Sequence, residues 1–201
     1  MFYKMINKKR DEWYSSNDCT IKSLIDYMVN RGQLRDVKVD AIKTYLFLKI
    51  QGGCQPLSKL FADGFFNTVD IDELEVSKQT RDYLKDNPAA VALYEYATLK
   101  SDSGIQVSAK LENQIIKEPE SIDYSGFFKN AFYGVSYTDY LFSLPMGAGK
   151  TYLMAAFIYL DLYFASNETG NGVFAHNFII FAPSGLKSSV VPSLRTIQNF
   201  D

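Results

Sequence analysis

The sequence predicts an α/β fold, in which a partial parallel sheet over residues 139–201 follows a mostly helical region over residues 1–138. Apolar residues recur at helical spacing through the first region. Two short apolar runs, 140–144 and 178–182, are instead typical of buried strands. A helix-length apolar stretch separates these runs, and a further helical stretch follows the second. Strand, helix, strand, helix is the alternation of a parallel α/β sheet.

The first part of the chain favours short helices. Residues 1–18 are polar and mixed, which predicts an arm or one short helix. Apolar residues at helical spacing predict helices over 21–30 and 37–50, each followed by glycine. Pro56 then opens a short helix over 57–62.

The middle of the chain is also predicted to be helical. Residues 77–118 favour two or three helices, one of which starts at Pro88, and Gly104 separates the last of them. Residues 123–138 are rich in aromatic side chains and predict a short helix with a turn at Gly134.

The last part of the chain carries the pattern of the sheet. After the first predicted strand, residues 152–165 are apolar except for one aspartate and predict a buried helix. This stretch is too short to cross a bilayer, which needs about 20 residues. After the second strand, residues 186–200 predict another helix, which Pro192 kinks or interrupts.

The composition indicates a folded protein, and the net charge gives no overall basic signal for a nucleic-acid partner. The 201 residues are 47% hydrophobic and 22% charged, with a net charge of −2. Residues 1–53 are locally basic, which suits either phosphate contacts or a solvated helix surface. Cys19, Cys54 and His176 are too few for a zinc site, and two thiols without a disulfide pattern fit the cytoplasm.

Residues 147–151, Gly-Ala-Gly-Lys-Thr, form a glycine loop with the strongest chemical signal in the chain. Triphosphate binding needs convergent backbone N–H groups, and glycines let the chain curl closely around the phosphates. A helix that begins at the loop directs its positive end at the anion. A chance glycine turn beside a lysine is the alternative.

The residues of the glycine loop, and those just before it, have expected roles. Lys150 is the expected catalytic residue, reaching the β- and γ-phosphates, and Thr151 is the expected Mg²⁺ ligand. Leu144 stands where the full pattern has its first glycine. The residues expected to bind the nucleotide are Pro145, Met146, Gly147, Ala148, Gly149, Lys150 and Thr151.

A second candidate site follows the second predicted strand. Loops at the carboxyl ends of strands are where open α/β sheets bind ligands. Small hydroxyl residues with a lysine at a helix start suit contact with a phosphate backbone. Pro183, Ser184 and Lys187 are therefore the expected nucleic-acid-binding residues, and an ordinary strand-to-helix turn is the alternative.

These two segments together resemble superfamily 2 helicases. Residues 144–151, Leu-Pro-Met-Gly-Ala-Gly-Lys-Thr, resemble motif I, and residues 181–187 resemble motif Ia. The resemblance is strongest to the DEAD/DEAH-type Res (helicase and endonuclease) subunit of type III restriction enzymes. It implies that residues 139–201 are the start of a RecA-like lobe, with ATP and Mg²⁺ as cofactors. It also implies DNA as partner, a methyltransferase or specificity subunit as a second partner, and no membrane.

A third segment resembles the part of such helicases that precedes motif I. In residues 34–42, Leu-Arg-Asp-Val-Lys-Val-Asp-Ala-Ile, the resemblance assigns adenine contacts to Arg35 and Lys38, with lysine where the family has the glutamine that reads adenine. The segment lies more than a hundred residues before Lys150. Either residues 53–138 are an insertion, or residues 34–42 are simply the start of an amphipathic helix.

The resemblance implies an ATP-hydrolysing helicase or translocase of a restriction–modification or related defence system. Such motors also need an acidic Asp-Glu motif, an arginine finger and a second lobe, and the residues after Phe181 supply none of these. We therefore expect the chain to be the N-terminal part of a longer protein and to be almost inactive alone. The alternatives are a P-loop kinase or other small-molecule NTPase, and a non-catalytic interaction fragment.

Overall fold

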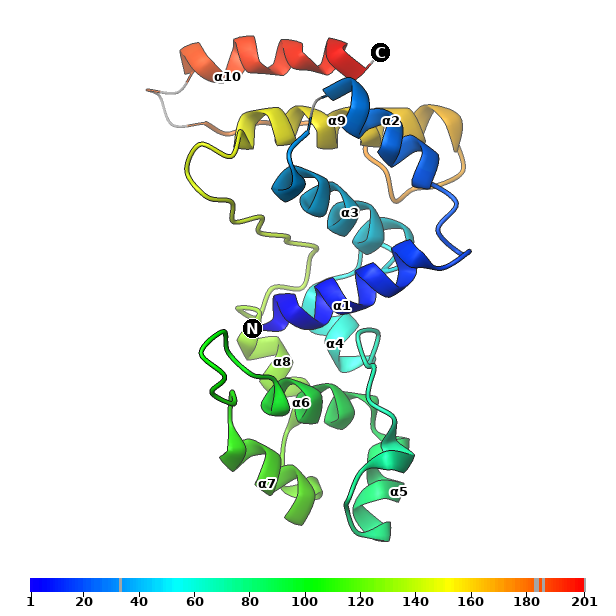
Figure 1. The fold of residues 1–201 in the computed structure, drawn as a ribbon, viewed down its shortest axis with the longest axis vertical. Coiled ribbons are helices and arrows are strands. Elements are labelled where there is room, and N and C mark those ends of the chain that lie inside the picture. Colours follow the sequence, from blue (N-terminus) through cyan, green and yellow to red (C-terminus); the bar gives the residue numbers. More distant parts are fainter. Residues whose placement is uncertain (33, 183–184, 186, 201) are drawn as a thin grey trace. The chain divides into compact units, whose positions relative to one another are not determined.

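Helices carry almost all regular structure in the computed structural model, which describes residues 1–32, 34–182, 185 and 187–200 (Figure 1). The chain forms two units that interleave in sequence. Unit 1 comprises Met1–Glu12 and Gln55–Tyr140, and unit 2 comprises Trp13–Cys54 and Leu141–Asp201. The chain passes from one unit to the other within the first helix, after Cys54 and after Tyr140. The division expected after residue 138 stays a prediction.

Unit 1 is built from short helices that begin at the caps and prolines of the sequence. Ser77 and Asn87 accept hydrogen bonds from the backbone N–H groups of Thr80 and Ala90, and so cap two of these helices. The elements are the first part of α1 (Phe2–Ser15), α4 (Leu57–Ala62), η1 (Ile71–Glu73), α5 (Lys78–Asp86), α6 (Pro88–Thr98), α7 (Ala109–Lys117), η2 (Pro119–Ser121) and α8 (Tyr124–Ala131).

Aromatic rings fill the core of unit 1. The Phe61 ring of α4 lies 4.5 Å from Phe66 and 5.6 Å from Phe128 of α8, measured between centroids. Phe2 of α1 joins them, with its centroid 4.9 Å from that of Phe61. Burying these large rings is the main source of stability available to helices this short, which are marginal by themselves in water.

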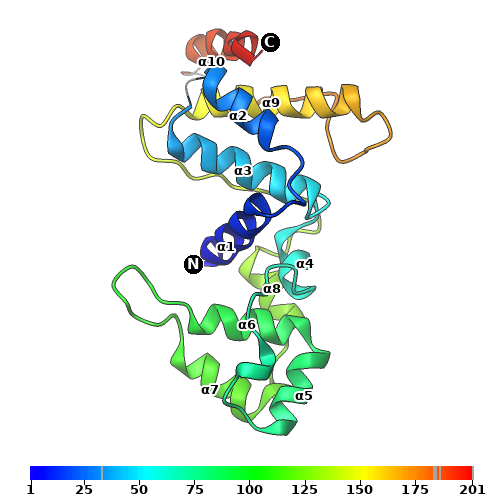
Figure 2. The ribbon, with the colours of Figure 1, turned by 45° about the vertical axis from the view of Figure 1, so that its right-hand side comes forward.

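Unit 2 contains the longest helix of the described residues. Its elements are α2 (Lys22–Gly32), α3 (Asp36–Ile50), α9 (Lys150–Asn167), α10 (Lys187–Leu194) and η4 (Arg195–Phe200). In Figures 1 and 2, α3 and α9 run side by side, and α2 and α10 lie close to α9 as well. α9 buries residues around much of its circumference, including Leu153, Ala155 and Ala165. A helix that is apolar on most sides belongs in a core, as the sequence predicted.

The predicted α/β fold is wrong. Among the described residues there is no sheet, and the single β-bridge joins Lys100 and Gln106 rather than the expected strands. Residues 140–144 and 178–182 are drawn as coil, and their described backbone groups form no hydrogen bond with another segment's backbone (Figure 1). The structure described is therefore all-α.

The two apolar runs do not form a buried layer. Leu141 of the first run is 91% exposed, and Phe181 of the second is 92% exposed, whereas strands inside a parallel sheet are covered on both faces. The second run lies along helices, where residues 178–181 share a hollow with Tyr45 of α3 and Phe157 of α9.

The predicted helices are largely confirmed. The short helix over 57–62 has the predicted bounds, and the helix with the first-turn proline starts at Pro88. Pro192 lies inside α10, which gives way to η4 soon after it. Within the described ranges, no helix combines the length and the apolar character needed to cross a membrane.

Candidate functional site

The glycine loop has the backbone conformation that its glycines allow. Gly147 has φ of 79° and Gly149 has φ of 78°, a left-handed region that other residues adopt at a cost. α9 begins immediately afterwards at Lys150, with Gly149 as its N-cap. The loop-then-helix part of the predicted site is therefore present, although no strand precedes it.

The N–H groups of this turn are available to an anion. Ala148 donates its N–H to the Pro145 carbonyl at 3.2 Å. Within the described part of the chain, the N–H groups of Gly147, Gly149, Lys150 and Thr151 donate to no backbone or side-chain acceptor. The first N–H groups of a helix lack partners inside the helix, and a phosphate satisfies them with favourable charge.

The expected side chains of the loop reach solvent. Lys150 is exposed and Thr151 is half-buried. The Thr151 hydroxyl has no hydrogen-bond partner among the residues described, so it is available to a metal ion. The described residues hold no group of three or more His, Cys, Asp or Glu side chains suited to a metal. Any Mg²⁺ here would be held by Thr151 and by the phosphates themselves.

The segment assigned to adenine lies at the same place. Lys38 is in the first turn of α3, and its Nζ would lie 3.5 Å from a Cβ added at Gly149. Lys38 Nζ is also 4.8 Å from the ring centroid of Tyr152, in the first turn of α9. Burial, and to a smaller extent the neighbouring Arg35, lowers the pKa of Lys38. The structure thus brings Lys38 to the glycine loop across more than a hundred residues of sequence.

The residues expected to contact nucleic acid are only partly described. Pro183 and Ser184 lie outside the described residues. Lys187 is the first residue of α10, and its side chain also lies outside the described part. Their contact with nucleic acid stays a prediction.

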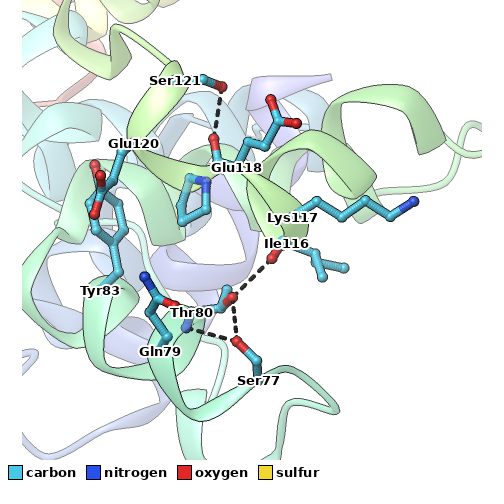
Figure 3. Close-up of a pocket in the computed structure, with 10 residues that line it drawn as sticks. Ser77, Gln79, Thr80, Tyr83, Ile116, Lys117, Glu118, Glu120 and Ser121 are labelled. Carbon is cyan, nitrogen blue, oxygen red and sulfur yellow. Dashed lines mark hydrogen bonds between the residues drawn. The ribbon is translucent and has the colours of Figure 1, made fainter.

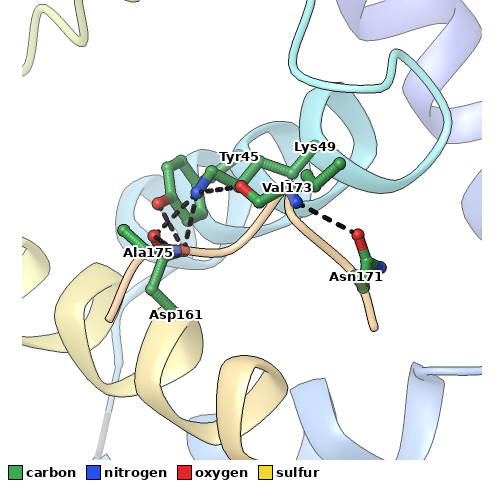
Figure 4. Close-up of polar contacts among 6 residues, drawn as sticks. All are labelled: Tyr45, Lys49, Asp161, Asn171, Val173 and Ala175. Carbon is green, nitrogen blue, oxygen red and sulfur yellow. Dashed lines mark hydrogen bonds and ion pairs between the residues drawn. The ribbon is translucent and has the colours of Figure 1, made fainter. Parts of the chain in front are cut away.

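A buried ion pair that sequence analysis did not find joins α3 to α9 (Figure 4). Lys49 Nζ donates to both carboxylate oxygens of Asp161, at 2.9 and 2.7 Å, and to the Val173 carbonyl at 3.1 Å. Asp161 also accepts from the Tyr45 hydroxyl at 2.7 Å and from the Ala175 N–H at 3.0 Å. The side chains of Lys49 and Asp161 are 8% and 2% exposed. Both carboxylate oxygens accept hydrogen bonds, so the pair has a structural role and holds α3 and α9 together. The one sign of this ion pair in the sequence was Asp161, the single aspartate in the apolar stretch 152–165.

Unit 1 contains a separate cavity of about 760 Å³ between α5 and the segment from Ile116 to Ser121 (Figure 3). The hydroxyls that line it bond to their own surroundings. Thr80 Oγ1 lies 2.9 Å from Ser77 Oγ and donates to the Ile116 carbonyl at 2.9 Å. Ser121 Oγ donates to the Glu118 carbonyl at 2.7 Å. These hydrogen bonds hold the walls of the cavity together.

Comparison of the chain with protein-family models, with curated proteins and with solved structures gave no match.

Proposed function

We propose that the chain binds the phosphates of ATP with Mg²⁺ at the glycine loop, as part of an ATP-dependent DNA helicase or translocase. One observation carries this: a Gly-Ala-Gly-Lys-Thr loop, with unpaired N–H groups and an exposed lysine, opens the long helix α9. Lys150 neutralises phosphate charge, and the Thr151 hydroxyl contacts the metal. The resemblance to helicase motif I supports the wider assignment to a restriction–modification or related defence system. The cytoplasm is the proposed location, since neither Cys19 nor Cys54 forms a disulfide.

The residues present fit a triphosphate in three respects. A Cβ added at Gly147 would meet no atom within 4 Å, so there is space over the turn. The helix start offers N–H donors. Lys150 follows Gly149 directly in sequence, and Lys38 lies close to Gly149 in space. MgATP supplies a transferable phosphoryl group when bound, and the chain's own residues position it and offset its charge.

Binding of a fluorescent ATP analogue to the chain, with and without Mg²⁺, tests the proposed site. Lys150→Ala is expected to weaken binding at least about tenfold, the effect of losing one charge-assisted contact. It should leave thermal unfolding unchanged, because Lys150 is exposed. Thr151→Val should reduce the part of the affinity that depends on Mg²⁺. Wild-type affinity in Lys150→Ala would show that the loop is not the site.

The rate of ATP hydrolysis, and its response to DNA, distinguishes the proposed function from the alternatives. We expect hydrolysis by this chain to be far below the typical enzyme rate of about 10 per second, because no acidic motif follows the loop. A turnover near that rate would contradict the expectation. In the whole motor, single-stranded DNA should stimulate ATP hydrolysis. A P-loop kinase or a non-catalytic interaction fragment would show no such stimulation.

A further inference from the structure

The Lys38 side chain lies close to Gly149 of the glycine loop. Its Nζ and Cδ would lie 3.5 and 3.9 Å from a Cβ at Gly149, which is van der Waals contact with the place where that atom would be. Lys38 therefore lies directly over the left-handed residue that opens α9. Phosphate bound by the N–H groups of Gly149 and Lys150 would be near this ammonium group as well.

The aromatic ring beneath Lys38 is fixed in position. Lys38 Nζ lies 4.8 Å from the Tyr152 ring centroid, a cation–π contact. The Tyr152 hydroxyl donates to the Gly32 carbonyl, at the end of α2, at 3.0 Å. Its ring also packs against Phe200, with 5.6 Å between centroids. Because Tyr152 is held at both its hydroxyl and its ring, Lys38 is positioned before any ligand arrives.

The Lys38 ammonium has no counter-ion. Within the described ranges it forms no ion pair and no hydrogen bond, and the nearest charged influence on it is the like charge of Arg35. It is also half-buried, so water compensates its charge only in part. By contrast, the more deeply buried Lys49 is fully paired with Asp161. A half-buried cation without a counter-ion, placed beside unpaired N–H groups, is a place for an anion.

We propose that Lys38 is a second phosphate-binding lysine of the glycine loop, so that the site recognises the polyphosphate chain and tolerates any nucleobase. This role rests on the proposed function, because it presupposes a triphosphate in the loop. It differs from the role that the resemblance assigned to position 38, where the family has a glutamine that contacts adenine. A lysine has only donors and carries a full positive charge, which suits phosphate oxygens. The consequence is that ATP, GTP and inorganic tripolyphosphate compete for one site with similar affinities.

Competition binding tests this role with three ligands and matched variants. A fluorescent ATP analogue is displaced by ATP, GTP or tripolyphosphate from the wild-type chain, Lys38→Met and Lys38→Gln. Lys43→Met is the control, because Lys43 lies on the same helix but packs over Tyr14, 3.9 Å from its centroid. We expect the Lys38 variants to weaken all three ligands by the same factor, about 10- to 100-fold, the range for one charge-assisted contact. Lys43→Met should change each by less than about twofold.

The possible results distinguish a failure of the role proposed for Lys38 from a failure of the glycine loop as the binding site. If the Lys38 variants weaken ATP but not tripolyphosphate, Lys38 contacts the base, and the inference is overturned. If they weaken nothing, Lys38 has no role in binding, and the loop alone is the site. If the wild-type chain binds none of the three ligands, the proposed function fails and this role fails with it. Trp13 fluorescence checks that each variant is folded, and Lys38→Arg, which keeps the charge, should retain most of the affinity if Lys38→Met does not fold.

Discussion

Removing the Asp161 carboxylate, which joins α9 to α3, is expected to destabilise unit 2 strongly. In Asp161→Leu, the buried Lys49 ammonium would lose its counter-ion and keep the Val173 carbonyl as its hydrogen-bond acceptor, with the Tyr45 and Phe174 ring centroids each 5.2 Å away. An uncompensated buried charge of this kind costs about 3–5 kcal/mol. Lys49→Met should cost a similar amount, because the carboxylate, 2% exposed, would keep only the Tyr45 hydroxyl and the Ala175 N–H.

The double variant Lys49→Met/Asp161→Leu should recover most of this loss. Both charges are then gone. The remaining cost comes from the Ala175 N–H and the Val173 carbonyl, which lose their partners, while the half-buried Tyr45 hydroxyl is able to reach water. An unsatisfied buried donor costs about 1–3 kcal/mol. The two single costs would add to roughly 6–10 kcal/mol, so the coupling between the residues should be at least about 3 kcal/mol.

Urea unfolding followed by tryptophan fluorescence measures these changes. Trp13 is the sole tryptophan of the chain, is 7% exposed and lies 5.6 Å from the Phe47 ring of α3, so its signal reports unit 2. Asp18→Asn is the control, because Asp18 is exposed, and it should change the free energy of unfolding by less than about 0.5 kcal/mol. Single variants that cost under about 1 kcal/mol, or a double variant whose cost is their sum, would refute the reasoning.

Three further predictions concern other parts of the chain. Burial, and then the nearby Tyr83, raises the pKa of Tyr124, whose hydroxyl donates to the Pro119 carbonyl. The stabilisation this gives is fully present below the unfolded pKa of about 10 and is lost progressively as the pH rises from there towards the raised folded pKa. The stability advantage of wild type over Tyr124→Phe should therefore begin to shrink above about pH 10 in urea titrations followed by circular dichroism. Gly149→Ala should destabilise unit 2 by about 1–2 kcal/mol, the cost of a Cβ in the left-handed region, and a neutral effect on Trp13-detected unfolding would mean that the turn relaxes. Lys187→Ala should weaken binding of two unrelated single-stranded oligonucleotides equally and lower the salt slope by slightly under one, whereas an unchanged slope would assign Lys187 to the surface.

The helices could be predicted from the sequence because their signals are local. A helix bonds each N–H to a carbonyl four residues earlier, so spacing, caps and prolines within one segment suffice. Pro88 with its Asn87 cap and the short α4 helix show this. A strand depends on N–H and C=O groups of another segment, which its own residues do not specify. The run 140–144 has the composition of a buried strand, but no described segment pairs with it.

The same distinction applies to the candidate site. The left-handed glycines and the helix start at Lys150 follow from residues that are neighbours in sequence. The approach of Lys38 depends on the packing of α3 against α9, which no local pattern encodes. The resemblance of residues 34–42 singled out a segment that the structure places beside the glycine loop, and its role in binding stays a prediction. The lack of a counter-ion at Lys38 became visible only from its surroundings. The pairing of Lys49 with Asp161 was missed for the same reason.

The interleaving of the two units has a consequence for biosynthesis. α3 ends at Ile50 and α9 begins at Lys150, so the ribosome must add the intervening residues before the two helices can meet. At about 5–20 residues per second, that delay is roughly 5–20 s. Throughout it, Lys49 has no carboxylate to bind, and the face of α3 that α9 will cover is open to other nascent chains or to chaperones. A gene fragment that starts at residue 139 would encode Asp161 without the lysine that neutralises it, and its product should accumulate as insoluble protein.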